Sequence, residues 1–204
     1  MNISSEHDLH ATPTMRDWET LIACNNVDAA SALVRATPVE TVGEALGWAV
    51  NRNKPEIVAV LAPYADRGDL GVFLGAAAEW GFLECVQVLN EVCSEEERVY
   101  ALGDAAYDGQ MEVVAYLVTQ CDPKNYQSFG LQMASLGNQM EVAQYLHPLS
   151  NPQEAIVDLL KLAPQNSDAR AAAARIEHLN NVAQNACLRA EVSGLIKPAR
   201  VSKI

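Results

Sequence analysis

A column of acidic residues that recurs every 28 or 29 positions constrains this chain more than any other feature of its sequence. The column consists of Asp28, Glu56, Glu84, Glu112 and Glu141. Three positions before each acid stands a residue that tolerates a left-handed backbone, in the series Asn25, Asn53, Gly81, Gly109 and Asn138. Leucine lies ten positions before the last four acids, and alanine lies seven positions before them. Such coincident columns indicate internal repeats.

A second column with the same period marks where each repeat begins. It holds residue types that favour helix N-caps, namely Thr37, Asp66, Ser94, Asp122 and Asn151. Three of them precede a proline, and Ser94 is followed three positions later by a glutamate, as in a capping box. Apolar residues recur at helical spacing on both sides of each Asn or Gly turn, for example over 95–107 and 110–119. The sequence therefore predicts an all-α fold, an α-solenoid of stacked helix-turn-helix repeats.

The stretch 105–117 carries the clearest family likeness. It reads Ala-Ala-Tyr-Asp-Gly-Gln-Met-Glu-Val-Val-Ala-Tyr-Leu and resembles the A-A-x-x-G-x-x-E-V-V-x-x-L core of ankyrin repeats. The resemblance extends over residues 18–150. It departs from the family in its short period, since ankyrin repeats have about 33 residues, and in the missing T-P-L-H entry motif. The resemblance implies degenerate ankyrin-like repeats without the β-hairpin finger, and a protein-interaction scaffold without catalysis.

Beyond Asn151 the repeat pattern decays, which suggests four regions. We expect a flexible N-terminal segment at 1–15, the ankyrin-like solenoid at 16–164, one or two C-terminal capping helices at 165–196 and a basic tail at 197–204. Residues 152–162 are expected to form one more first helix, and Ser167 to cap an alanine-rich helix. Charge changes at the same place, because residues 1–163 carry 8 basic and 23 acidic side chains and residues 164–204 carry 6 and 3.

Composition excludes several function classes. The net charge of −12 argues against nucleic acid as a partner, and no apolar stretch approaches the roughly 18–20 residues of a membrane span. The five cysteines include no C-x-x-C pair, and the N-terminus has no apolar signal core, so we expect a cytoplasmic protein. No histidine pair has metal-ligand spacing and no glycine-rich loop can hold phosphate, which predicts no metal and no cofactor.

No catalytic residue is predicted either. Cys93 has no histidine predicted nearby to activate it, and Cys85 occupies a column that is apolar in the other repeats, so it is expected in the core. The acids of the recurrent column lie near helix N-termini, where a carboxylate stabilises the helix dipole. The glycine column Gly47, Gly75 and Gly103 indicates close approach of neighbouring first helices.

The outward positions of the first helices are the candidate binding surface. They lie 12, 8 and 5 residues before each acid and are rich in aromatic and acidic residues, which are common at interfaces. The candidate partner-binding residues are Glu44, Trp48, Glu79, Tyr100, Asp104, Tyr107, Phe129 and Met133. We expect this face to be concave, as in the ankyrin arrangement. The alternative is that these side chains pack against neighbouring first helices.

The resulting hypothesis is a non-enzymatic interaction module. It would act as an inhibitor, adaptor or chaperone of another protein that presents a basic or amphipathic segment, with no nucleic acid and no membrane as partner. Three alternatives stay open: an effector that a bacterium exports into a host cell, a hydrolase that uses the groove, and an acidic mimic of nucleic acid.

Overall fold

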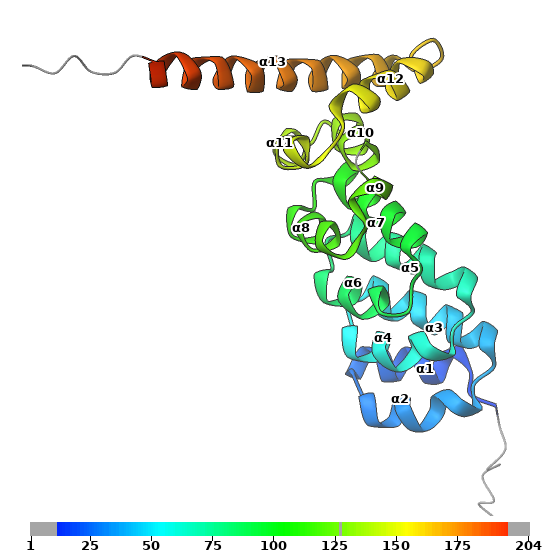
Figure 1. Cartoon of the computed structure of the whole chain (residues 1–204). Helices are drawn as coiled ribbons and strands as arrows, with labels where there is room; N and C mark the ends of the chain where they lie inside the picture. Colours follow the sequence, from blue (N-terminus) through cyan, green and yellow to red (C-terminus); the bar gives the residue numbers. More distant parts are fainter. Residues whose placement is uncertain (1–11, 127, 196–204) are drawn as a thin grey trace, which may run out of the picture.

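The computed structural model describes residues 12–126 and 128–195, and every regular element in these ranges is a helix. Antiparallel helix pairs follow one another and stack into an elongated array (Figure 1). The first helices of the pairs are α1 (Met15–Cys24), α3 (Val39–Asn51), α5 (Arg67–Glu79), α7 (Glu95–Asp108) and, after the short α9 (Pro123–Tyr126), α10 (Phe129–Leu136). The second helices are α2 (Val27–Leu33), α4 (Pro55–Leu61), α6 (Leu83–Asn90), α8 (Met111–Gln120) and α11 (Met140–Leu146). The all-α fold class predicted from the sequence is thereby confirmed.

The turn inside each pair is made the same way every time. All five predicted turn residues have a positive φ, from 50° at Asn53 to 79° at Gly109. The amide that follows the turn residue then donates a hydrogen bond back to the end of the first helix. In the second to fifth pairs its acceptor is the carbonyl of the recurrent alanine, as in Gln110 N to Ala105 O at 2.8 Å. A left-handed residue and this bond together close a helix in the Schellman manner.

The recurrent apolar columns form the core of the array. In the second to fifth pairs, the recurrent leucine and alanine of the first helix and the leucine five residues after the acid are completely buried. Each first helix contacts its own second helix and the first helices of the neighbouring pairs. The side chains of one column thus pack against the equivalent side chains of the neighbouring pairs, which explains why residue size at these positions is so constant.

Some of the N-caps predicted from the sequence are confirmed, and others are wrong. Ser94 forms the predicted capping box with Glu97, and the Asn151 side chain accepts from Glu154 N at 3.4 Å. Thr37 is not a cap, because α3 starts one residue later with Pro38 as N-cap. The Thr37 hydroxyl instead donates to Leu33 O at 2.9 Å and accepts from the indole of buried Trp18 at 3.3 Å.

The predicted continuous first helix of the fifth pair is wrong. It is divided into α9 and α10, with Gln127 between them outside the described residues. This pair has one residue more than its neighbours between its cap, Asp122, and its turn residue, Asn138. An added residue in an unbroken helix would rotate everything behind it by about 100°. The break between α9 and α10 accommodates the added residue without this rotation. Tyr126 at the end of α9 is buried.

Two helices follow the fifth pair. The first, α12 (Pro152–Leu162), has the predicted bounds. The second, α13 (Ser167–Leu195), is capped by Asn166 rather than by the predicted Ser167, since Asn166 Oδ1 accepts a hydrogen bond from Asp168 N at 2.9 Å. The first half of α13 packs on α10 and α12, where Arg175 donates to Ser135 O at 2.8 Å. Residues 181–189 are all exposed, so the second half extends beyond the array (Figure 1).

The outer regions proposed from the sequence are only partly covered. The predicted flexible segment at 1–15 overlaps the described residues only from 12 onward, and the predicted basic tail at 197–204 lies outside them. None of the helices in the described part combines the length and the apolar character needed to span a bilayer.

Candidate partner-binding face

The outward face of the first helices keeps several large side chains in contact with solvent. On α7, Tyr100 and Tyr107 are 57% and 45% exposed, and on α3, Trp48 is 36% exposed. The acids Glu44 on α3 and Glu79 on α5 are exposed as well. Because α3, α5 and α7 contact one another in this order, these residues lie on one continuous surface, which we call the first-helix face.

The recurrent glycines allow these helices to approach closely, as predicted. A Cβ atom built on Gly47 would lie 2.8 Å from Cε1 of Phe73, and one built on Gly75 would lie 2.7 Å from Oδ2 of Asp104. At Gly103 it would overlap the ring of Phe129. Each glycine therefore receives a side chain from the next first helix, and two of those side chains, Asp104 and Phe129, are candidate binding residues.

Asp104 is the most unusual acid of the face. It is half-buried over Gly75, and within the described residues its carboxylate has no hydrogen-bond or ion-pair partner. Burial raises the pKa of Asp104, and the negative charges of Glu79 and Asp108 raise it further. A carboxylate that is partly desolvated and close to other acids is stabilised more by a bound cation than an ordinary surface carboxylate is.

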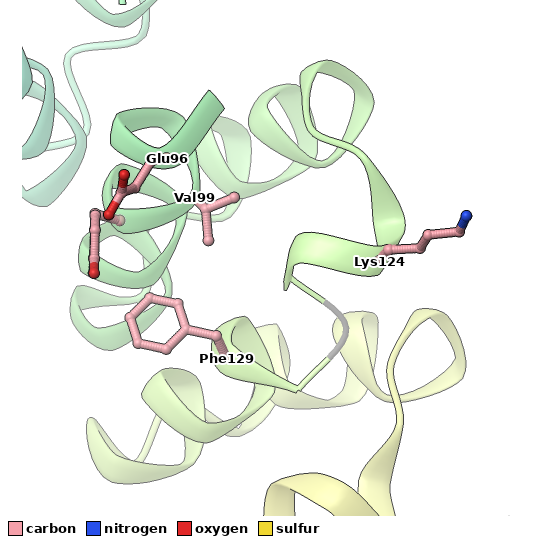
Figure 2. Close-up of a pocket in the computed structure, with 5 residues that line it drawn as sticks. Glu96, Val99, Lys124 and Phe129 are labelled. Atoms are coloured by element: carbon pink, nitrogen blue, oxygen red, sulfur yellow. The ribbon is translucent and has the colours of Figure 1, made fainter. Parts of the chain in front are cut away.

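A groove of about 620 Å³ lies beside these residues (Figure 2). It is lined by Glu96, Val99 and Tyr100 from α7, by Lys124 from α9 and by Phe129 from α10. The rings of Tyr100 and Phe129 meet edge to face with centroids 6.0 Å apart. In Figure 2, Val99 and Phe129 lie between Glu96 and Lys124, so an apolar centre is flanked by one acid and one base.

The candidate binding residues named from the sequence do not include three groove residues, Glu96, Val99 and Lys124. They border the groove where the first helix of the fifth pair is divided into α9 and α10. The extra residue in that pair, visible as the single spacing of 29 in the acidic column, was a signal that could have pointed to this place.

The other candidates lie apart from the groove. Trp48 is stacked under Arg52, whose guanidinium carbon lies 4.2 Å from the ring centroid, and α5 separates Trp48 and Glu44 from Tyr100. Met133 is partly buried against the core, because α10 also packs on α12 and α13. The structure therefore brings together Tyr100, Asp104 and Phe129, with Glu79 near Asp104 and Tyr107 one turn further along α7, and leaves Glu44, Trp48 and Met133 at the edges.

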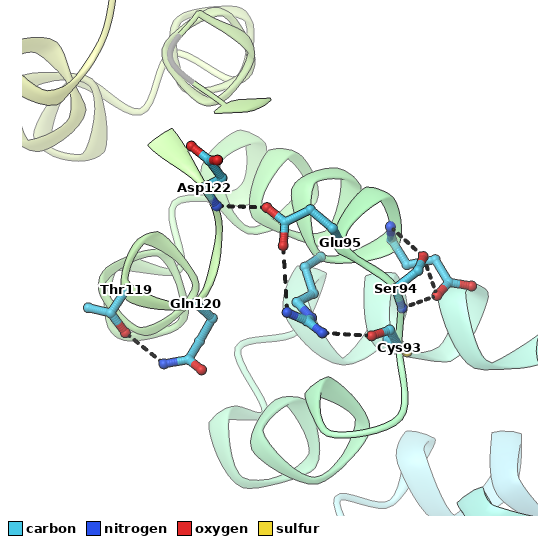
Figure 3. Close-up of polar contacts among 8 residues, drawn as sticks. Cys93, Ser94, Glu95, Thr119, Gln120 and Asp122 are labelled. Carbon is cyan, nitrogen blue, oxygen red and sulfur yellow. Dashed lines mark hydrogen bonds and ion pairs between the residues drawn. The ribbon is translucent and has the colours of Figure 1, made fainter. Parts of the chain in front are cut away.

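A polar network holds the start of α7 against the start of α9 (Figure 3). Glu95 accepts from Asp122 N at 2.7 Å and pairs with Arg98 at 3.5 Å, and Arg98 donates to Cys93 O at 2.9 Å. Hydrogen bonds from the Ser94 amide and hydroxyl lower the pKa of Glu97. These contacts fix the end of α7 that forms one wall of the groove.

The three buried cysteines of the array are poor nucleophiles. Cys85 is fully buried, as predicted, and its thiol donates to Asn53 Oδ1 at 3.4 Å. Burial raises the pKa of the Cys85, Cys93 and Cys121 thiols to about 11, so these thiols are protonated at neutral pH. Across the described ranges, no three His, Cys, Asp or Glu side chains are grouped closely enough to hold a metal ion.

Comparisons with known proteins give no family. No protein-family model, curated protein or solved structure matches the chain. The function must therefore be argued from its own residues.

Proposed function

We propose that this chain is a non-enzymatic protein-interaction module built as a degenerate ankyrin-like solenoid. Its first-helix face binds a basic or amphipathic segment of another protein, and Tyr100, Asp104, Tyr107 and Phe129 form the centre of the interface. The array acts by occupying or presenting that segment, as an inhibitor, adaptor or chaperone does. A cytoplasmic location agrees with two exposed cysteines, Cys24 and Cys187, in a chain with no C-x-x-C pair.

One observation carries this proposal: two largely exposed tyrosines on α7 flank a half-buried acid that has no partner among the described residues. Tyrosine offers a large contact area at low entropic cost and is enriched among residues that dominate binding energy. An arginine or lysine from the partner would sit between the two rings and pair with Asp104. That contact would reverse the effect of Glu79 and Asp108 on the Asp104 carboxylate.

The groove supplies the apolar half of the same interface. Val99 and the edge-to-face pair of Tyr100 and Phe129 offer a surface for an aliphatic or aromatic anchor. Glu96 and Lys124 at its sides favour a segment of defined direction, because each attracts the opposite charge. A segment with a basic residue and a nearby apolar residue meets both requirements.

The test is a pull-down from native lysate with the wild type and the triple variant Tyr100→Ala/Asp104→Lys/Tyr107→Ala, at low and moderate salt. We expect the variant to bind its partner at least about tenfold more weakly, since such anchor residues each contribute at least about 1–2 kcal/mol to the binding free energy. The control variant Tyr64→Ala/Tyr145→Ala/Glu19→Lys removes two tyrosines and reverses one acid elsewhere, and it should retain the partner. Circular dichroism must show both variants folded. Equal capture by both variants would refute the assignment of the face.

A further inference from the structure

The second helices carry a groove of their own, on a different surface from the first-helix face. It has a volume of about 600 Å³ and is formed by α4, α6 and α8. Its apolar lining includes Ala59 and the half-buried Val88 and Tyr116, and exposed carboxylates of Glu56, Glu84 and Glu91 border it. We call this site the second-helix groove.

The groove has an apolar lining and strongly negative borders. Burial and the negative charge of Glu91 raise the pKa of Tyr116. In the described part of the chain, none of the three bordering carboxylates forms an ion pair, and Glu56 only accepts from the Asn25 amide at 3.3 Å. The groove therefore fits a segment that combines apolar and basic side chains.

Two of these carboxylates, Glu56 and Glu84, belong with Glu112 to a regularly spaced set, which we call the carboxylate row. Glu56, Glu84 and Glu112 occupy equivalent positions in the first turns of α4, α6 and α8, and these helices contact one another in that order. Packed helices lie roughly 8–10 Å apart. A ligand that crosses the second helices therefore meets one carboxylate about every 8–10 Å.

One segment of this chain has the matching pattern. Residues 196–204 read Ile-Lys-Pro-Ala-Arg-Val-Ser-Lys-Ile, with a base at every third position: Lys197, Arg200 and Lys203. In a polyproline-type backbone every third side chain lies on the same side, and three residues advance by about 9 Å. The bases then have the same step as the carboxylates, and Ile196, Val201 and Ile204 remain for the apolar lining.

We propose that the second-helix groove binds the segment 196–204 of a second copy of this chain. Lys197, Arg200 and Lys203 pair with the carboxylate row, and the apolar residues of the segment cover Ala59, Val88 and Tyr116. The direction of α13 favours another copy as the donor. Because residues 181–189 are exposed, the second half of α13 extends clear of its own array (Figure 1). This surface and this partner are independent of the proposed function.

The experiment is sedimentation velocity of the full-length chain over a range of protein concentrations. We expect concentration-dependent association that weakens as salt is raised. The full-length variant Lys197→Gln/Arg200→Gln/Lys203→Gln should associate at least tenfold more weakly. So should Glu91→Lys, which places a base at the C-cap of α6, where the helix dipole favours it and folding is not threatened. Glu19→Lys, with the same charge change on α1, should associate at least as well as the wild type.

A peptide of sequence 196–204 checks the spacing directly. Added in excess, it should dissociate the wild-type oligomer, whereas a peptide of the same composition with its three bases adjacent should be much weaker. A chain that stays monomeric at all concentrations would overturn the proposal. So would equal association of the wild type and the tail variant, or equal effects of the two peptides.

Discussion

Replacing Gly103 by alanine tests both the helix packing and the candidate face. In an isolated helix the change is favourable by about 1 kcal/mol, because alanine has the higher helix propensity. In this protein the new Cβ overlaps the Phe129 ring, whose Cζ would lie only 2.9 Å away. Inserting a methyl group into such a contact costs roughly 1–3 kcal/mol. Displacing Phe129 also weakens its edge-to-face contact with Tyr100, worth about 0.5–1.5 kcal/mol.

The expected net effect is a loss of roughly 1–3 kcal/mol in the free energy of unfolding. For a chain of this size each kcal/mol corresponds to about 2–4 °C, so a loss of about 2 kcal/mol lowers Tm by roughly 4–8 °C. Gly68→Ala is the matched control, since Gly68 also lies in a first helix but a Cβ there would meet nothing within 4 Å. That variant should gain up to about 1 kcal/mol.

Urea unfolding followed by circular dichroism measures both variants. If Gly103→Ala stabilises the chain as much as Gly68→Ala does, the first helices are not held at the distance that the structure shows, and the wall of the groove is not formed by Phe129.

Three further predictions concern caps, charge and thiols. Ser94→Ala should lower the free energy of unfolding, measured by urea titration, by about 1 kcal/mol. Asp66→Ala should lower it less, since Asp66 is an N-cap without a side-chain cap bond. Equal losses would contradict the capping box. The raised pKa of Asp104 means that the folded state binds the Asp104 proton more tightly than the unfolded state. Ionisation of Asp104 therefore destabilises the fold at neutral pH. This effect disappears as the pH falls below the ordinary carboxyl range. Asp104→Asn should therefore raise Tm at pH 7 and change it little at pH 3, and an unchanged Tm at pH 7 would refute this. A thiol reagent at pH 8 should label exposed Cys24 and Cys187 quickly and the three buried cysteines only after unfolding, as mass spectrometry can show; rapid labelling of all five would contradict their burial.

Several parts of the fold could be predicted from the sequence because they are local and repeated. A left-handed turn needs Asn or Gly, and the five residues that supply it are visible as a column. Buried positions at helical spacing keep the same residue in the second to fifth repeats, as Leu46 and Leu74 do. The capping box at Ser94 is likewise complete within four residues. Each of these features depends on neighbours in the chain, so the amino-acid order alone determines it.

The environment of the candidate site depended on which helices meet. The sequence indicated that Tyr100 and Asp104 face outward, but only the packing of α7 over Gly75 placed the Asp104 carboxylate half inside the protein. The extra residue of the fifth pair was visible, yet whether a helix would bulge, shift or break there is decided by the contacts of Tyr126 with the core. The groove at Phe129 follows from that break.

The same division holds at the C-terminus. The alanine-rich composition of 168–179 is sufficient to predict a helix, since alanine has the highest helix propensity. It does not predict that residues 181–189 of α13 stay exposed, because that depends on the short length of α12 beside it. Periodicity thus determined which residues form each helix and which side is buried. The distances between side chains of different repeats, on which binding depends, were decided only when the helices stacked.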